Sequence, residues 1–282
     1  MADAPAAADV EPIDVEPAAV LAPRTAVVVV DDGTAISYHR WEPDAGVDPD
    51  PVPVVLQHGF SSHTQVEWAD HGTVAALTAA GRVVVGIDAR GHGMSGKSPD
   101  PARYGEPRMA RDLRAVVAAL GVPAVDLVGY SMGAVIALLA ATDGDAVRRL
   151  VVGGVGAGVV EVGGVDTRVL PNDVLADALL AGSPHHDLPP EVAGLVAFAA
   201  ATGADFPSLA AQARAAHQDG IDLAAITAPT LVIAGDDDPL AERPHVLAEA
   251  IPGARARVVP GDHGTAVGSP AFRAAVVAFL CG

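Results

Sequence analysis

A serine, a group of aspartates and a histidine occur in this chain in an order that suits nucleophilic catalysis. Ser131 lies within residues 129–133, Gly-Tyr-Ser-Met-Gly, which match the pattern G-x-S-x-G. A serine hydroxyl is a poor nucleophile at neutral pH unless a histidine, oriented by a carboxylate, removes its proton. Three aspartates at 236–238 and then His263 follow Ser131 along the chain. These residues predict the attack of a serine oxygen on an acyl carbon.

The residues on either side of the motif predict the strand, sharp turn and helix that such a serine needs. Asp126, Leu127, Val128 and the residues around them predict a short buried strand, and residues 134–141 predict a helix. A turn this tight requires small neighbours, which Gly129 and Gly133 provide. The backbone N–H of Met132 is then a candidate donor to the oxyanion that forms in the reaction.

A second oxyanion donor is expected in the loop after an early strand. Residues 54–57 predict a short buried strand, and His58, Gly59 and Phe60 follow it. Gly59 allows the backbone to approach closely, so the N–H of Phe60 is the candidate donor. We interpret His58 as a residue that braces this loop.

The candidate acids and the candidate base each follow a predicted strand. Residues 230–234 precede the aspartates at 236–238, and residues 256–259 precede His263. Ligands of open, mostly parallel sheets bind at the carboxyl ends of the strands, so these side chains are expected beside Ser131. The residue types alone leave the three aspartates as alternatives.

The remaining downstream histidines have no comparable partners. Four of them are interpreted as surface residues: His185, His186, His217 and His245. The pair at 185 and 186, with Asp187, lacks further ligands at a spacing that suits a metal. We therefore expect neither a metal nor an organic cofactor.

Apolar strands that alternate with helices predict an α/β fold with a mostly parallel sheet and helices on both faces. Residues 25–30 and 35–41 predict a hairpin around an Asp-Gly turn, and residues 42–53 predict a loop. Further strands are expected at 54–57, 82–87, 126–128, from 150, 230–234 and 256–259. Helices are expected within 66–80 and at 108–120, 134–141, 243–250 and 272–280.

The composition limits the classes of partner. The chain has 282 residues, of which 50% are hydrophobic, and a net charge of −18. This charge argues against nucleic acid or an anionic membrane as the main partner. Cys281 is the single cysteine, and no apolar run is long enough to span a membrane. Residues 1–22 predict a flexible acidic leader rich in Ala and Pro, without the basic start of a secretory signal, so a cytoplasmic location is expected.

An insertion at 158–218 interrupts the predicted core, which comprises residues 23–157 and 219–282. Prolines divide the insertion into short apolar helical pieces, such as 174–180 and 191–201. We interpret it as a helical cap, or lid, over an apolar pocket. Arg168 and Arg214 are candidates for binding a substrate carboxylate.

Four motifs in this chain together resemble those of the α/β-hydrolase fold superfamily, in its broad group of esterases, lipases, haloperoxidase-like enzymes and C–C bond hydrolases. They are residues 58–60 (H-G-F), 88–95 (D-A-R-G-H-G-M-S), 129–133 and 229–239. The resemblance covers residues 25–282. It implies that Asp238 is the acid that orients His263, with Asp236 and Asp237 as loop residues.

The chain departs from the superfamily pattern beside the base, where Asp262 replaces a common Gly, and after the serine motif, where Ala134 replaces another. Asp262 is expected either to raise the pKa of His263 or to point to water. Ser131 as nucleophile disfavours the branches that use an aspartate. In the turn at 88–95, Arg90 and His92 are expected to hold loops by hydrogen bonds.

The sequence predicts a serine hydrolase that cleaves carboxylic esters of small to medium apolar substrates through an acyl-enzyme on Ser131. Alternatives on the same three side chains are a C–C bond hydrolase and a thioesterase. A small-molecule receptor without turnover is a further alternative. The expected partner is a small-molecule ester; the sequence leaves the acyl length and the oligomeric state open.

Overall fold

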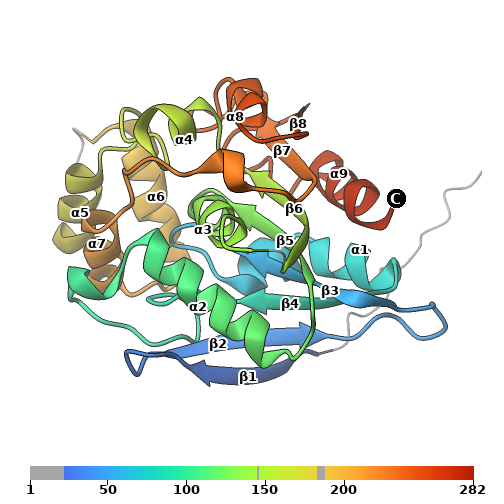
Figure 1. Ribbon diagram of the computed structural model, residues 1–282. Coiled ribbons are helices and arrows are strands. Elements are labelled where there is room, and N and C mark those ends of the chain that lie inside the picture. The colour runs from blue at the N-terminus through green and yellow to red at the C-terminus, as the bar shows by residue number, and fades with distance from the viewer. Residues whose placement is uncertain (1–21, 145, 183–187) are drawn as a thin grey trace, which may run out of the picture.

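The computed structural model describes residues 22–144, 146–182 and 188–282, so nearly all of the leader and the histidines at 185 and 186 lie outside it. Within these ranges eight strands form one sheet, in the order β1-β2-β4-β3-β5-β6-β7-β8 (Figure 1). β2 pairs antiparallel with β1 and β4, and the other neighbours pair parallel. The sheet is therefore mostly parallel, as predicted. The strands are β1 Arg24–Val29, β2 Ala35–Trp41, β3 Asp50–Gln57, β4 Arg82–Ile87, β5 Val125–Tyr130, β6 Val147–Gly153, β7 Thr230–Gly235 and β8 Arg255–Val259.

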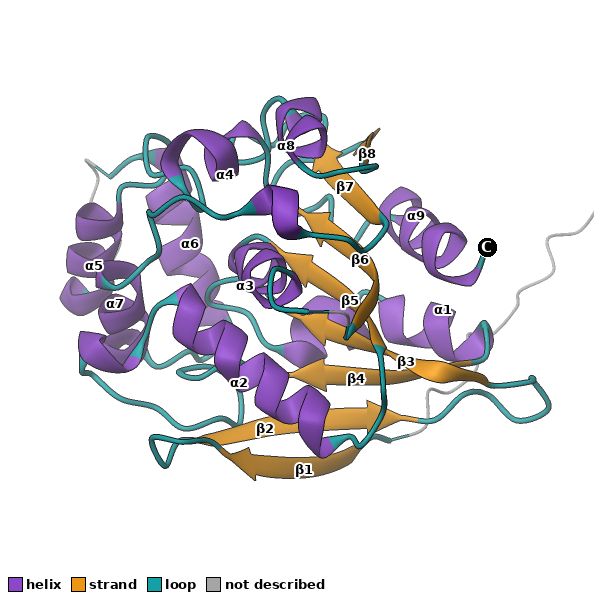
Figure 2. Ribbon diagram, viewed as in Figure 1, coloured by secondary structure: helices purple, strands orange, loops and turns teal. Residues whose placement is uncertain are grey.

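Helices cover both faces of the sheet (Figure 2). α2, α3 and α8 contribute to the hydrophobic core on one face, and α1 and α9 contribute to the core on the other. The helices are α1 Thr73–Ala79, α2 Glu106–Ala119, α3 Met132–Ala141, α4 Ala157–Val162, α5 Asn172–Ala181, α6 Pro190–Ala201, α7 Phe206–Arg214, α8 Pro244–Ala250 and α9 Pro270–Cys281. Short helical turns lie at Gln65–Ala69, Pro101–Arg103 and Leu223–Ala225.

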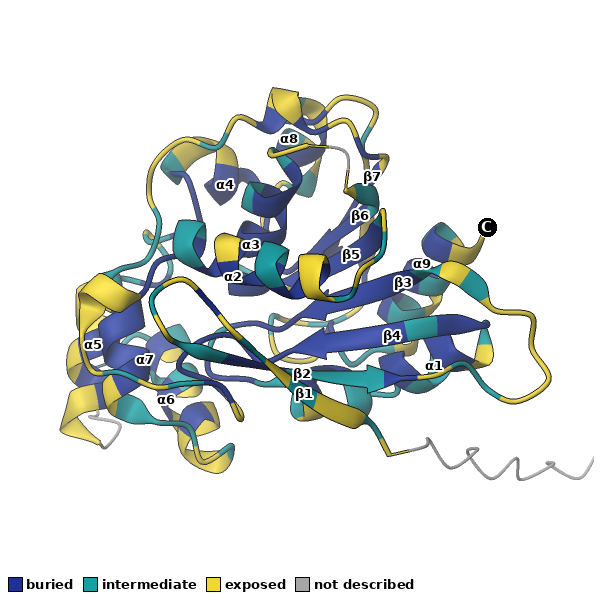
Figure 3. Ribbon diagram, turned by 60° about the horizontal axis from the view of Figure 1, so that its bottom comes forward, coloured by how far each residue is buried: buried dark blue, intermediate teal, exposed yellow. Residues whose placement is uncertain are grey.

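The central strands are mostly apolar because both of their faces are covered. All six residues of β5 are buried, as are the last five of β3. A continuous apolar run is the pattern expected of a strand that is covered on both sides. β1 lies at the edge of the sheet and exposes Val27 and Val29 (Figure 3).

The predicted hairpin forms, since β1 pairs with β2 from Arg24 opposite Arg40 to Val29 opposite Ala35. The predicted loop over 42–53 is too long, because β3 begins at Asp50. Asp50 pairs with Arg82, and the register then shifts before Val54. The strand thus contains Asp50 and two prolines, Pro51 and Pro53, where composition alone indicates a loop.

Buried ion pairs join the amino ends of the central strands. The Asp126 carboxylate, at the start of β5, is fully buried and lies 2.6 Å from guanidinium nitrogens of both Arg82 and Arg148. Arg82 is itself 1% exposed and also donates to the carbonyl of Val52 at 2.7 Å. These bonds hold the end of the sheet that lies opposite Ser131, which follows the carboxyl end of β5.

The helices α5, α6 and α7 lie in the segment that was interpreted as a cap. They share an apolar cluster of their own, in which Leu175, Val196 and Leu209 are buried. Leu240, which follows β7, belongs to the same cluster. In Figure 2 these helices lie together at one end of the sheet, beyond the carboxyl ends of the central strands.

Candidate active site

Ser131 occupies a strained turn between β5 and α3. Its backbone has φ 53° and ψ −119°, in the region that residues with a side chain rarely adopt. A Cβ atom at Gly129 would collide with the carbonyl oxygen of Gly133, and one at Gly133 would collide with the carbonyl oxygen of Gln57. The spacing G-x-S-x-G is therefore a steric requirement of this turn. A strained residue of this kind costs about 1–3 kcal/mol and persists where the surrounding structure holds it.

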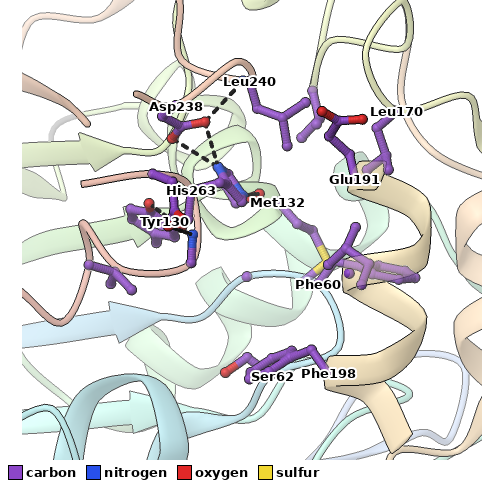
Figure 4. Close-up of a pocket in the computed structure, with 18 of the residues that line it drawn as sticks. Phe60, Ser62, Tyr130, Met132, Leu170, Glu191, Phe198, Asp238, Leu240 and His263 are labelled. Atoms are coloured by element: carbon purple, nitrogen blue, oxygen red, sulfur yellow. Dashed lines mark hydrogen bonds and ion pairs between the residues drawn. The ribbon is translucent and has the colours of Figure 1, made fainter. Parts of the chain in front are cut away.

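The structure brings Ser131, His263 and Asp238 together from three separate loops. His263 Nε2 lies 3.0 Å from Ser131 Oγ. His263 Nδ1 lies 3.0 and 2.9 Å from the two Asp238 carboxylate oxygens (Figure 4). The Tyr130 hydroxyl donates to the carbonyl of His263 at 2.7 Å and so holds its loop. This arrangement can pass a proton from the serine to the imidazole while the carboxylate fixes the ring.

The other aspartates near His263 have different contacts. Asp236 accepts a hydrogen bond from the N–H of Gly261 at 2.8 Å, which fixes the turn before His263. Asp262 accepts bonds from the Thr265 hydroxyl at 2.6 Å and from the Gly264 N–H at 3.1 Å. These bonds, that of Thr265 first, lower the pKa of Asp262. The Asp262 carboxylate therefore stabilises the turn at residues 262–265.

Two backbone N–H groups beside Ser131 are free to bind an anion. Among the described residues, neither the N–H of Phe60 nor that of Met132 donates a hydrogen bond, and both residues line the central cavity. The loop approaches so closely that a methyl group on Gly59 would lie 3.3 Å from Ser131 Cβ. Free donors at this place can stabilise negative charge on a substrate oxygen.

Glu67 is a site residue that the sequence analysis did not identify. Its carboxyl accepts a hydrogen bond from the N–H of Gly59 at 2.8 Å, directly before the candidate donor Phe60. The side chain is buried, and burial raises its pKa to about 8. The available signal was a carboxyl residue between Val66 and Trp68, but it does not by itself indicate contact with the loop.

The loops around the site are braced by hydrogen bonds, as predicted. The N–H of Ala89 donates to His58 Nε2 at 2.9 Å, and the N–H of Ser61 donates to His92 Nε2 at 3.2 Å. Burial lowers the pKa of His58 to about 4 and that of His92 to about 3, so both rings are neutral acceptors. Arg90 holds the turn at 88–95 through two bonds to Asp112, at 2.6 and 2.7 Å.

A cavity of about 940 Å³ extends from Ser131 to the helices α5–α7. Its apolar wall includes Leu175, Leu195 and Phe198, and Figure 4 places Phe198 beside the loop that carries Phe60 and Ser62. Arg168 and Arg214 do not line it, which corrects their interpretation as carboxylate binders. Arg168 pairs with Asp166 and Glu161, and Arg214 pairs with Asp177.

Comparison with known proteins identifies the family. Residues 52–159 match the family model of the alpha/beta hydrolase fold. A hydrolase from Pseudomonas aeruginosa PA01 is 27% identical and superposes with a TM-score of 0.69, over 91% of this chain and 98% of that one. The chain belongs to the α/β-hydrolase superfamily. The enol-lactonase from Burkholderia xenovorans LB400 is also similar to this α/β-hydrolase, with 25% identity, a TM-score of 0.69 and coverage of 91% and 100%.

A curated relative is similar over a shorter range. The sn-1-specific diacylglycerol lipase ABHD11 of Mus musculus is 38% identical over 118 residues, which is 42% of this α/β-hydrolase. The matched part is 36% of the lipase, so this chain corresponds to about a third of that relative's length.

Two of the remaining downstream histidines lie within the described residues, and neither lines the cavity beside Ser131. His245 is on α8, and His217 is partly buried rather than on the surface, after α7. Over the described ranges there is no group of three or more His, Cys, Asp or Glu side chains arranged to hold a metal ion. The same ranges contain no helix long and apolar enough to cross a membrane.

Proposed function

We propose that this α/β-hydrolase is a serine esterase that cleaves carboxylic esters of small to medium apolar substrates. The observation that carries the proposal is the continuous contact from Ser131 Oγ through the His263 ring to the buried Asp238 carboxylate. Two of the three similar proteins, a diacylglycerol lipase and an enol-lactonase, have names that describe cleavage of an ester bond. This shared chemistry supports ester cleavage over the other acyl reactions.

In the proposed mechanism, Ser131 Oγ attacks the ester carbonyl carbon while its proton moves to His263 Nε2. Asp238 accepts the hydrogen bond from Nδ1–H and stabilises the imidazolium. The N–H groups of Phe60 and Met132 bind the oxyanion of the tetrahedral intermediate. The intermediate collapses, the C–O bond breaks, and the alcohol leaves with the proton from Nε2. Water, deprotonated by the same nitrogen, then releases the acid and restores the serine.

The segment that contains α5–α7 is proposed to act as a lid over the acyl or alcohol part of the substrate. Its inner residues Leu195 and Phe198 line the cavity and supply the apolar surface that such a substrate needs. No metal or organic cofactor takes part in the proposed reaction.

The test is hydrolysis of p-nitrophenyl esters with two to twelve acyl carbons, by wild type and Ser131→Ala in parallel. Chain-length-dependent turnover that is lost in the variant is the expected result. Turnover that survives in a folded Ser131→Ala protein contradicts the proposal. Thioesters and vinylogous diketones, assayed beside the esters, test the alternatives of thioesterase and C–C bond hydrolase.

A further inference from the structure

The cavity beside Ser131 has an unusual charge distribution for a site that takes an apolar ester. Eight of the residues that line it are Asp or Glu, and none of these lining residues is Lys or Arg. The cavity therefore offers no Lys or Arg side chain to pair with an anionic substrate group, and a carboxylate inside it meets like charge.

Gln212 has an unsatisfied acceptor in this cavity. The side chain lies on α7, is 1% exposed and lines the cavity. Its Nε2 donates to the sulfur of Met132, the residue after Ser131. Its Oε1 is buried and accepts no hydrogen bond from any residue that the structure describes. A buried carbonyl oxygen without a donor is unfavourable, so a donor from a ligand stabilises it.

Glu106 provides a carboxyl group in the same cavity. It is the first residue of α2 and is 5% exposed. The N–H of His217, shortly after α7, donates to its Oε2 at 2.7 Å, and none of the described salt bridges includes it. Burial raises its pKa to about 7. A ligand cation that lies against this carboxyl offsets the cost of its ionisation.

We propose that Glu106 and Gln212 form a subsite for an ammonium group, so that the preferred esters are amino-bearing and those that carry a carboxylate are rejected. Each N–H of an ammonium is a donor, and the two side chains offer the charged and the neutral acceptor that such a group requires. The contact between Gln212 and Met132 places this subsite next to the nucleophile. The proposal rests on the proposed esterase function and adds the substrate class.

The experiment uses three esters of equal chain length, which end in a methyl, an ammonium or a carboxylate group. One set carries this end group on the acyl part, and a second set carries it on the alcohol part. In wild type we expect kcat/KM to be highest for the ammonium ester and lowest for the carboxylate ester in at least one set. In Glu106→Gln the ratio of kcat/KM for ammonium over methyl is expected to fall by about tenfold. Gln212→Met, of similar volume, is expected to lower the same ratio.

The control variant is Glu191→Gln, which removes a carboxyl from another part of the cavity, on α6. It is expected to change the ammonium preference less than Glu106→Gln does. An equal loss on all three esters in Glu106→Gln, or equal effects of the two Glu variants, would overturn the subsite.

Failure of the esterase function gives a different result, in which wild type hydrolyses none of the esters. In that case, calorimetric titration measures whether the protein binds hexylammonium or hexanoate, which tests the subsite without turnover. Binding of hexylammonium alone, weakened in Glu106→Gln, supports it. Absence of binding, or equal binding of both ions, contradicts it.

Discussion

The Nδ1 atom of His263 lies within 3.0 Å of both carboxylate oxygens of Asp238, and the Asp238 side chain is fully buried. One of these oxygens also accepts the N–H of Leu240 at 2.9 Å, which fixes the carboxylate from the other side. Of the three adjacent aspartates, Asp238 therefore is the one that can hold the imidazole with its Nε2 toward Ser131.

Replacement of Asp238 is expected to reduce turnover far more than replacement of its neighbour. Asp238→Asn leaves an amide that no longer fixes the tautomer of His263, and kcat is expected to fall by about 10⁴. Asp237→Asn, at an exposed position in the same loop, is the matched control and is expected to retain activity within a few-fold. Steady-state kinetics on the best ester compares them. Equal activities of the two variants would contradict the role of Asp238.

Glu67 is expected to make stability depend on pH. Its pKa is about 8 in the folded protein against 4.5 for an ordinary Glu, so the folded state retains a proton that the unfolded chain loses between these values. The contribution of this proton to the free energy of unfolding is complete below pH 4.5. It is lost as the pH rises to 8, at up to about 1.4 kcal/mol per pH unit. Glu67→Gln should not show this loss.

The measurement for Glu67 is urea unfolding of both proteins at intervals from pH 4.5 to 8. The difference between them isolates this carboxyl, because other groups contribute equally to both. Among these are His58 and His92, whose lowered pKa values give stability that rises with pH up to about 6.5. Parallel curves for wild type and Glu67→Gln would show that Glu67 titrates normally.

Gly133→Ala is expected to destabilise the fold and to displace the loop that carries Phe60. The added methyl group collides with backbone oxygens of Gln57 and His58, so the loop that carries Phe60 has to move. We expect a loss of several kcal/mol in stability or of about 10²-fold in kcat. Gly220→Ala has open space around it and is the control. Thermal unfolding and ester kinetics on both variants give the comparison, and a normal Gly133→Ala protein would refute the steric argument.

Asp126→Ala is expected to destabilise the protein by about 3–5 kcal/mol without changing the chemistry at Ser131. The substitution leaves the buried guanidinium of Arg82 without the carboxylate that lies 2.6 Å away. Urea denaturation measures the loss. Asp143→Ala, which removes a mostly exposed partner of Arg114, is the control and is expected to cost less than about 1 kcal/mol. A similar small loss in both variants would mean that the buried pair contributes little.

Much of the fold followed from local patterns that the structure preserves. The turn at Ser131 was predictable because its glycines are needed for local steric reasons, and β4 was predictable because three consecutive valines follow Arg82. The start of β3 was not predictable, because Asp50 is held in the strand by Arg82 and Arg148, which are distant in sequence.

The same distinction applies to the site. Ser131 and His263 follow strands and occupy motif positions, so their meeting was expected. Glu67, Glu106 and Gln212 have no motif; each is significant only through a contact with a distant segment. Likewise, the sequence does not show that Arg168 and Arg214 are already paired with carboxylates. Their ion pairs with Asp166 and Asp177 are visible only in the folded chain.

The central claim is that Ser131 is the nucleophile that His263 activates. The most direct measurement is reaction of the folded protein with a fluorophosphonate, followed by mass spectrometry of its peptides. We predict one adduct in wild type, on the peptide that contains Ser131, no adduct in Ser131→Ala, and much slower labelling in His263→Ala. An adduct on another residue, or no adduct on a folded wild type that hydrolyses esters, would contradict the account.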